Sequence, residues 1–566
     1  MASTPDVARR GAAPANDCGP VRHSRRERWR MLTWALVHLV FVAHLVQWWR
    51  SGSTLTPIEP SEAMQTLEQG YLNAGFLFFG IAIAATAVFG RFFCGWGCHL
   101  VAYQDMAGAL LRRVGWKPRP FRSRLLVYVP IGAAFYMFIW PQIARLAEGR
   151  PFPTIVYHLT TSDLWETFPS IGISLLTFVV CGGLIVFLLG NKGFCTYACP
   201  YGAFFGQADR LAFGQILVSD ACTGCGHCTA TCTSNVRVHE EVRVHKKVVD
   251  TGCMKCMDCV DVCPKGALSY GFSVPSLFQR TRGRDTSKEK RTHAKAGKTS
   301  PIRYDFTWPQ EIALGLLFLF CLYAYRGLYE AIPFLLSLGL AAVTSFVLLF
   351  AFRGWRQGGV VLQRLTLRSA GRWTPAGWMF QAVTALLLTF VAHSVWIQFH
   401  AHQAEAHVAR AQAAPDDAAY RREAGEAARH YQRTLDHGLF EVAAWRLGLG
   451  SSQASIGQWS ESEQNLRRAL ELDPELARAH VSLADVLART DRREEGLQHL
   501  ADAARLDPEV AALTFADAAL QVGTDGDCQV ALDALNAWQA HAPHLPARRV
   551  AQIEAARAAL RRRIAA

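Results

Sequence analysis

The sequence predicts a mostly α-helical protein that crosses a membrane about seven times, with a small α+β domain inserted between spans and a helical solenoid at its C-terminus. Three observations lead to this fold class. Seven apolar stretches are long enough to cross a bilayer, eight of the 16 cysteines fall between Cys222 and Cys263, and the C-terminal region carries an internal repeat. At 566 residues the chain is also too long for one ordinary domain.

The composition is both apolar and basic. Hydrophobic residues make up 51% of the chain, yet its formal net charge is +13, so we expect the apolar and charged parts to be segregated. In a multi-span protein a basic excess points first to loops on the cytoplasmic side, and no nucleic-acid partner is expected. Tight C-x-x-C clusters indicate metal sites in a reducing compartment, whereas disulfide frameworks are typical of small secreted domains.

The first apolar stretch, 29–49, follows a polar tail (1–28) that ends in an arginine-rich run. It closes with Gln47-Trp48-Trp49-Arg50, which is typical of an interfacial anchor and not of a signal-peptide cleavage site. One of the following stretches could instead be re-entrant or interfacial. These are 124–145, which contains Pro130 and Pro141, and the close pair within 310–352. The remaining predicted spans are 72–93, 124–145, 170–190, 310–328, 331–352 and 377–398.

Lysine and arginine in the short loops predict the orientation. The loops 94–123 and 353–375 are basic, whereas 50–71 has one Arg and three Glu. This alternation puts the N-terminus in the cytoplasm and the C-terminus in the periplasm of a bacterial inner membrane. The predicted domains are a basic tail (1–28), a four-helix membrane domain (29–190), a cytoplasmic cysteine-rich domain (191–275), a basic linker (276–309), a three-helix membrane domain (310–398) and a periplasmic repeat domain (399–566).

An internal repeat runs through the C-terminal region. Leu472-Asp473-Pro474-Glu475 recurs 34 positions later as Leu506-Asp507-Pro508-Glu509. This period resembles tetratricopeptide repeats, and about three repeats fit in 417–545; a generic helical bundle is the alternative. Stacked helix pairs form a curved surface that binds peptides or proteins, so we expect a periplasmic partner protein to dock there.

Two cysteine runs have the spacing of bacterial ferredoxin motifs, which bind two 4Fe-4S clusters. In such motifs the fourth cysteine of each run ligates the other cluster. Zinc is the alternative, although its sites usually pair two C-x-x-C knuckles. The first run has Thr233 where proline is usual, and Gly224 and Gly226 permit tight turns near the metal. The predicted ligands are Cys222, Cys225, Cys228 and Cys263 for cluster 1, and Cys253, Cys256, Cys259 and Cys232 for cluster 2.

A second type of motif, C-x3-C, closes the second and fourth predicted spans. Cys94 and Cys98 form the first pair, and Cys195 and Cys199 the second, followed by Pro200. The two pairs could form one four-cysteine site, two dithiols or unreactive packing contacts. They are therefore candidates for an additional redox or metal site.

In this order, the motifs of residues 30–272 resemble the NapH/NosR/CcoG group of membrane-bound polyferredoxins. The resemblance implies an electron-transfer component, and not a stand-alone enzyme, that relays electrons between the quinone pool or a cytoplasmic donor and a partner respiratory or redox enzyme. The alternative is a CcoG-like maturation factor that reduces or delivers copper and holds its client on the repeat domain; a redox sensor is a third hypothesis. Three features depart from the group: His99 stands where proline is usual, no flavin-attachment sequence is recognisable, and the repeat tail is not the one expected of CcoG.

Other candidate residues carry less weight. His38, His44 and His393 lie in predicted spans, but hydrogen-bonded histidines are common near interfaces, so haem is not expected. A quinone is a candidate substrate, although the sequence identifies no site for it. Asp105 is a candidate proton acceptor, and the alternative is that it caps a helix or is solvated. Isolated cysteines are expected to be structural: Cys18, Cys181, Cys321 and Cys528.

Overall fold

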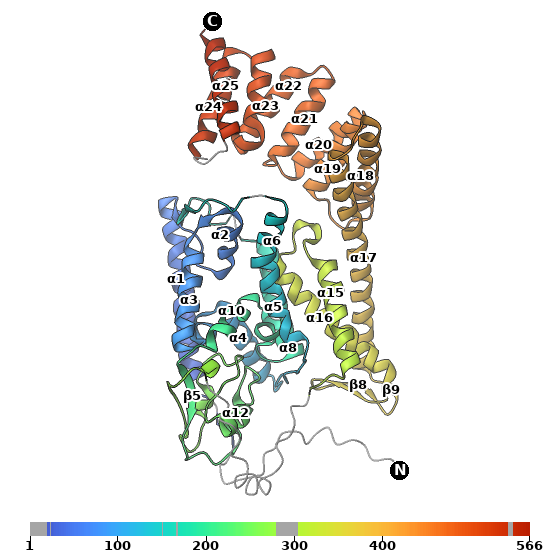
Figure 1. Ribbon diagram of the computed structural model, residues 1–566. Coiled ribbons are helices and arrows are strands. Elements are labelled where there is room, and N and C mark those ends of the chain that lie inside the picture. The colour runs from blue at the N-terminus through green and yellow to red at the C-terminus, as the bar shows by residue number, and fades with distance from the viewer. Residues whose placement is uncertain are drawn as a thin grey trace. The chain divides into compact units, whose positions relative to one another are not determined.

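The computed structural model describes residues 20–22, 24–149, 151–165, 168–278, 304–541 and 547–565, and these are mostly helical (Figure 1). Two compact units make up the chain. Unit 1 comprises Met1–Leu322 and Pro333–Leu387, and unit 2 comprises Tyr323–Ile332 and Leu388–Ala566. Cys18 and most of the basic tail and of the basic linker lie outside the described residues.

Six helical segments among the described residues are long and apolar enough to cross a membrane. They coincide with six of the seven predicted spans. The segments are α1 (Arg26–Ser51), Leu126–Ala147, Ile171–Leu189, α15 (Trp308–Tyr325), α16 (Phe334–Arg356) and α17 (Pro375–Gln412).

The remaining predicted span, 72–93, forms the shorter helix α3 (Ala74–Phe89). Its 16 residues extend about 24 Å at 1.5 Å per residue, less than the roughly 30 Å hydrocarbon core of a bilayer. The helix ends at Gly90, where φ is +81° and a Cβ would lie 2.6 Å from Cε of Lys255. The cysteine-rich segment therefore packs against the position where the apolar pattern would extend the helix.

The segment Leu126–Ala147 stays helical through both of its prolines. Pro130 lies in the first turn of α5 (Val129–Ala134), where no intrahelical N–H is needed. Pro141 lies near the start of α6 (Trp140–Ala147) and offers no N–H to the Met137 carbonyl, and the π turn Phe135–Ile139 precedes it directly. A second π turn, Phe178–Leu184, joins α7 (Ile171–Thr177) to α8 (Ile185–Leu189).

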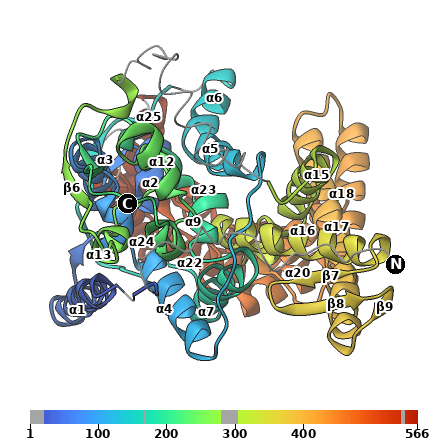
Figure 2. The same cartoon turned by 90° about the horizontal axis from the view of Figure 1, so that it is seen from below.

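The cysteine-rich segment is built on two antiparallel strands, β5 (Gly214–Val218) and β6 (Leu268–Phe272), with Val218 opposite Leu268. Both cysteine runs lie in the chain between these strands. Three short helices complete it: α11 (His227–Thr231), α12 (Val238–His245) and α13 (Asp258–Asp261). Since β5 contacts α3 and α13 contacts α1, this segment lies at one end of the unit 1 helices (Figures 1 and 2).

Unit 2 consists of helices that contact one another in chain order. The 34-residue period corresponds to a helix pair, because α19 and α21 each have 13 residues and α20 and α22 each have 14. The matched residues Leu449, Leu483, Leu466 and Leu500 are all buried. The tetratricopeptide assignment itself stays a prediction. The helices are α18 (Asp417–His437), α19 (Ala443–Ser455), α20 (Trp459–Leu472), α21 (Ala477–Arg489), α22 (Arg493–Leu506), α23 (Pro508–Val522), α24 (Asp525–His541) and α25 (Ala547–Ile564).

Candidate iron–sulfur and cysteine sites

Both cysteine runs contribute to one cavity beside α11. Its wall contains all four cysteines predicted for cluster 1, which are Cys222, Cys225, Cys228 and Cys263. Gly224 and Gly226 also line it, with φ values of +72° and +78°. These left-handed conformations favour glycine, so the loop between the first three cysteines has the tight turns that the sequence suggests.

The four cysteines predicted for cluster 2 also lie together. Cys253, Cys256 and Cys259 are buried, and Cys232 is half-buried. Burial, followed by the negative charges of Cys256 and Cys253, raises the pKa of Cys232 to about 12. By contrast Cys222 of the first set is exposed, so the first set opens to the surface while the second is enclosed.

The residues present fit iron–sulfur clusters. Each set offers four thiols, the number that a cubane cluster takes. A cluster held by four thiolates is anionic, and buried cations lie beside the second set. The clearest is Lys192, which is fully buried and whose Nζ has no hydrogen-bond partner among the described residues, although Asp105 Oδ2 is 3.6 Å away. Burial lowers the pKa of Lys192, but the charges of Asp105 and Cys256 outweigh it and raise that pKa.

The two C-x3-C motifs come together in unit 1. Cys94 lies in the π turn Phe93–Gly97, and Cys98 directly precedes α4 (His99–Arg113). Cys195 lies in α9 (Gly193–Tyr197), and Cys199 directly precedes α10 (Pro200–Asp209). Burial, and then the charges of Cys195 and Cys94, raise the pKa of Cys98 to about 12. Burial, and then the charge of Cys98, raise the pKa of Cys199 to about 12 as well. The two cysteine pairs therefore lie near one another, and Cys94, Cys98 and Cys195 belong to one apolar cluster. Whether they form one four-cysteine site or two dithiols stays a prediction.

Polar groups contact this four-cysteine group. The side-chain amide of Gln104 donates to Sγ of Cys195 at 3.1 Å, and Nη2 of Arg91 lies 3.7 Å from Sγ of Cys94. Donors to sulfur stabilise a thiolate or a thiolate-bound metal more than a neutral thiol. Such donors are compatible with a redox or metal site, and the role of these four cysteines stays a prediction.

The first C-x3-C loop packs directly on the second ferredoxin loop. A Cβ at Gly95 would lie 2.2 Å from the Met254 carbonyl oxygen, so only glycine fits there. Nε1 of Trp96 donates to the Lys255 carbonyl oxygen at 3.0 Å. Cys94 and Cys253 therefore belong to two loops in van der Waals contact. In the sequence, the glycine at position 95 is the one residue that could have indicated this close contact.

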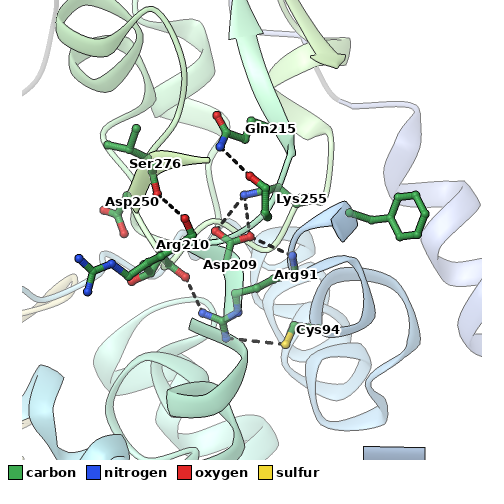
Figure 3. Close-up of polar contacts among 12 residues, drawn as sticks. Arg91, Cys94, Asp209, Arg210, Gln215, Asp250, Lys255 and Ser276 are labelled. Atoms are coloured by element: carbon green, nitrogen blue, oxygen red, sulfur yellow. Dashed lines mark hydrogen bonds and ion pairs between the residues drawn. The ribbon is translucent and has the colours of Figure 1, made fainter. Parts of the chain in front are cut away.

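Asp209, at the end of α10, ties these loops together (Figure 3). Its carboxylate accepts from the Arg91 backbone N–H at 3.1 Å and from Nζ of Lys255 at 3.1 Å. Nη1 of Arg91 in turn donates to the Thr251 carbonyl oxygen at 2.6 Å. All three charged side chains are buried. This ion pair and the two hydrogen bonds of Arg91 thus hold the end of α3, the end of α10 and the second ferredoxin loop in one arrangement.

A second buried network starts from Arg30 of α1. Its Nη1 donates to the Cys256 carbonyl oxygen at 3.1 Å and to Oδ1 of Asp258 at 2.7 Å, and its Nη2 is 3.5 Å from Oδ2 of Asp105. Asp105 is therefore neither a helix cap nor a solvated side chain, and its role as a proton acceptor stays a prediction. It is 6% exposed and paired with Arg30 and Lys192, because it lies inside α4 on the side that faces α1. A charge inside a predicted span, as at Arg30, is the signal that could have found this network.

The other sequence candidates have ordinary surroundings. His38 contacts the Tyr103 hydroxyl at 3.0 Å, His44 the Leu55 carbonyl oxygen at 3.1 Å and His393 the Tyr329 hydroxyl at 2.9 Å. These contacts match the alternative of hydrogen-bonded histidines. The isolated cysteines in the described part are buried as expected of structural residues: Cys181, Cys321 and Cys528.

Comparison with known proteins agrees with these sites. A family model described as a 4Fe-4S binding domain matches residues 73–117 and 171–215, each of which contains one C-x3-C motif. A 4Fe-4S dicluster domain matches residues 221–268, which contain both ferredoxin runs. The fold and the sites therefore define an iron–sulfur membrane protein of the ferredoxin type.

Curated relatives narrow this class. The methylamine utilization ferredoxin-type protein MauN of Methylobacillus flagellatus is 25% identical over 275 residues, which cover 45% of this chain and 93% of MauN. The ferredoxin-type protein NapH of Escherichia coli is 27% identical over 225 residues, 37% of this chain and 73% of NapH. The putative electron transport protein YccM of E. coli is 22% identical over 198 residues, 33% of this chain and 53% of YccM. The chain carries 4Fe-4S ferredoxin domains and is homologous to NapH- and MauN-type ferredoxin-like membrane proteins.

Proposed function

We propose that this chain is a membrane-anchored protein that relays electrons between the quinone pool or a cytoplasmic donor and a partner redox enzyme. When bound, 4Fe-4S clusters accept and release single electrons. The observation that carries the proposal is the contact of Gly95 with Met254, which joins the C-x3-C loop to the second ferredoxin loop. In this proposal electrons would pass between the exposed surface at Cys222 and the ends of the apolar helices through three cysteine sets.

The ligand sets in this proposal are those that the sequence predicts. Cys222, Cys225, Cys228 and Cys263 would hold cluster 1, and Cys253, Cys256, Cys259 and Cys232 would hold cluster 2. For Cys94, Cys98, Cys195 and Cys199 we propose a third 4Fe-4S cluster, supported by their mutual proximity and by the 4Fe-4S family that matches both motifs.

The protein's own residues support such a relay in two ways. Arg30, Lys192 and Lys255 are buried cations around the second set, and their charge would offset the charge gained on reduction. Enclosure of Cys253, Cys256 and Cys259 keeps water away from the second set, whereas the exposed Cys222 leaves the first set open to a soluble donor or acceptor.

Iron content and spectroscopy test the ligand assignment. With four irons per cluster, the purified chain should contain about 12 irons and give interacting S = 1/2 signals by electron paramagnetic resonance after reduction. The double variant Cys94→Ser/Cys195→Ser should lose about 4 irons and keep the ferredoxin signals. About 8 irons in both proteins would refute the third cluster only, and about four zincs without iron would refute the whole proposal.

A maturation factor that reduces or delivers copper is the second candidate function. Thiolates do favour copper(I), but transfer of a metal to a client needs accessible ligands, and Cys94 and Cys195 are buried. The arrangement therefore favours the relay. If the Cys94→Ser/Cys195→Ser variant loses copper reduction while its ferredoxin clusters remain reducible by quinol, the maturation function replaces the relay.

For the orientation we propose a cytoplasmic N-terminus and ferredoxin segment, with the helices of unit 2 in the periplasm as a docking surface for a partner protein. This needs an odd number of crossings, so the short helix α3 would cross as the seventh. A tag after Ile564 should then be cleaved by protease in right-side-out vesicles and protected in inverted ones. The reverse pattern would leave six crossings and put unit 2 in the cytoplasm.

A further inference from the structure

Unit 2 contains a cluster of histidines between α17 and α18 that the electron relay does not use. One ligand atom from each of His407, Glu426 and His430 lies within 4.8 Å of the others, and all three residues are half-buried. Glu426 and His430 are four residues apart on α18, which places them on one face of that helix. His400 and His407, seven residues apart on α17, likewise share a face.

Each of the two histidines in this trio is held through its Nδ1 atom. Nδ1 of His407 donates to Oε2 of Glu423 at 2.8 Å, and Nδ1 of His430 lies 2.7 Å from Nδ1 of His400. The His407 and His430 rings stack with their centroids 5.4 Å apart. Metal-binding histidines in proteins usually donate their other N–H to a carboxylate or a similar acceptor, which fixes the tautomer. Here that arrangement leaves Nε2 of both rings for an ion.

His400 supplies an independent observation. It is 3% exposed, and its Nε2 has no hydrogen-bond partner among the described residues. A buried polar atom of this kind is costly unless the side chain has another role. If Nδ1 of His400 accepts the Nδ1 proton of His430, the proton of neutral His400 is on this unpartnered Nε2, and the lone pair of His430 is on its Nε2.

A second trio in unit 2, His480, His499 and Asp502, has a simpler explanation. Nδ1 of His480 faces Nδ1 of His499 at 3.0 Å, and its Nε2 contacts the Pro474 carbonyl oxygen at 3.1 Å. Both nitrogens of His480 are thus satisfied within the protein. The positions 34 residues earlier hold Arg446 and Asn465, which are hydrogen-bonded at 2.6 Å, so this position is a contact between paired helices.

We propose that His407, His430 and Glu426 bind one divalent first-row transition-metal ion of the Zn²⁺ class, with water in the remaining positions. Two imidazoles and one carboxylate are a common ligand set for zinc, and imidazole also suits copper and nickel. Glu423 and His400 are the positioning residues behind the two imidazoles. Glu426 also pairs with Arg429, whose side chain is exposed and free to swing away when the ion binds.

Titration of the full chain in detergent with Zn²⁺ alone tests this proposal. The starting protein carries His499→Ala, so that the second trio does not contribute, and is assayed by calorimetry. We expect one equivalent to bind with a Kd in the micromolar range or below, and His407→Ala and His430→Ala each to weaken it at least about 100-fold. The matched control is His402→Ala, because His402 lies on α17 and its Nδ1 contacts the Gln398 carbonyl oxygen, outside the trio.

Two further variants protect the test against misfolding. Glu426→Gln keeps the size of the side chain and should weaken binding with an unchanged helical circular dichroism spectrum. His400→Phe should weaken Zn²⁺ binding about 10- to 100-fold and shift the visible absorption bands of a Co²⁺-loaded sample, which a purely structural role would leave unchanged. Equal Zn²⁺ affinity in His407→Ala, His430→Ala and His402→Ala would overturn the proposal, and so would the absence of binding in the starting protein.

Discussion

Replacing Lys192 by methionine should lower the reduction potential of the cluster that Cys256 would hold. Lys192 is fully buried, and it interacts electrostatically with Asp105 and Cys256. Methionine has a similar length, so the change removes the charge and leaves little cavity. Arg30 still pairs with Asp105 at 3.5 Å in the variant, and that carboxylate therefore keeps a counter-charge.

The magnitude follows from Coulomb's law. A unit charge about 8 Å from a redox centre contributes about 2 kcal/mol at an effective dielectric constant of about 20. At about 59 mV for each tenfold change in a one-electron equilibrium, this corresponds to about 90 mV. Reduction adds negative charge that the cation stabilises, so its loss must lower the potential.

Redox titration followed by electron paramagnetic resonance measures this shift in the full chain. Lys246→Met is the matched control, because Lys246 is exposed and has φ of 59°, close to the 58° of Lys192. Water and salt screen an exposed charge, so its removal should shift the potential by less than about 20 mV. Equal shifts in the two variants, or a higher potential in Lys192→Met, would refute the electrostatic reasoning.

Three further changes test the packing. Gly95→Ala puts a Cβ 2.2 Å from the Met254 carbonyl oxygen and should destabilise unit 1 by about 1–3 kcal/mol, which thermal unfolding in detergent measures. The control is Gly183→Ala, which should have no comparable effect because a Cβ there meets nothing within 4 Å. Asp209→Asn leaves the buried Lys255 without its counter-charge and should lower the free energy of unfolding by about 3–5 kcal/mol. The unfolding midpoint in denaturant should fall, and a midpoint like that of the unchanged chain would contradict the ion-pair role. Phe515→Ala leaves a cavity at a fully buried position of unit 2 and should lower the free energy of unfolding by about 3–5 kcal/mol. Circular dichroism measures this loss, and the cluster signals should remain; altered cluster signals would show that the change also affects unit 1.

Local patterns in the sequence predicted much of this protein. The two cysteine runs indicated iron–sulfur chemistry because ferredoxin motifs place three ligands of a cluster in one short loop, whose spacing is visible in the chain. Gly224 and Gly226 have the positive φ values that such a loop favours. Apolar length predicted six helices that are long and apolar enough to span a membrane, since the bilayer thickness sets a minimum that a residue count can meet. The prediction at 72–93 was too long, because hydropathy does not register that Lys255 packs against Gly90.

Contacts between distant parts of the chain were not predictable in the same way. Cys94 and Cys195 are 101 positions apart in the sequence, and whether they share a site depends on how the turn Phe93–Gly97 and α9 come together. Asp105 looked like a cap or a solvated residue until α1 placed Arg30 beside it. The charges of Asp209 and Lys255 carried no sign of their pairing, because ion pairs have no fixed sequence spacing outside helices.

By itself, then, the sequence determined the cofactor chemistry, the membrane-spanning segments and the 34-residue helical period, since each is written in residue type and local spacing. Only the tertiary structure decided that the four C-x3-C cysteines are neighbours, that Gly95 lies on Met254, and that buried cations surround the second ferredoxin loop. The physical reason is that such contacts arise when hydrophobic burial brings separate helices and loops together. Their partners are then chosen by shape and charge in three dimensions and not by position along the chain.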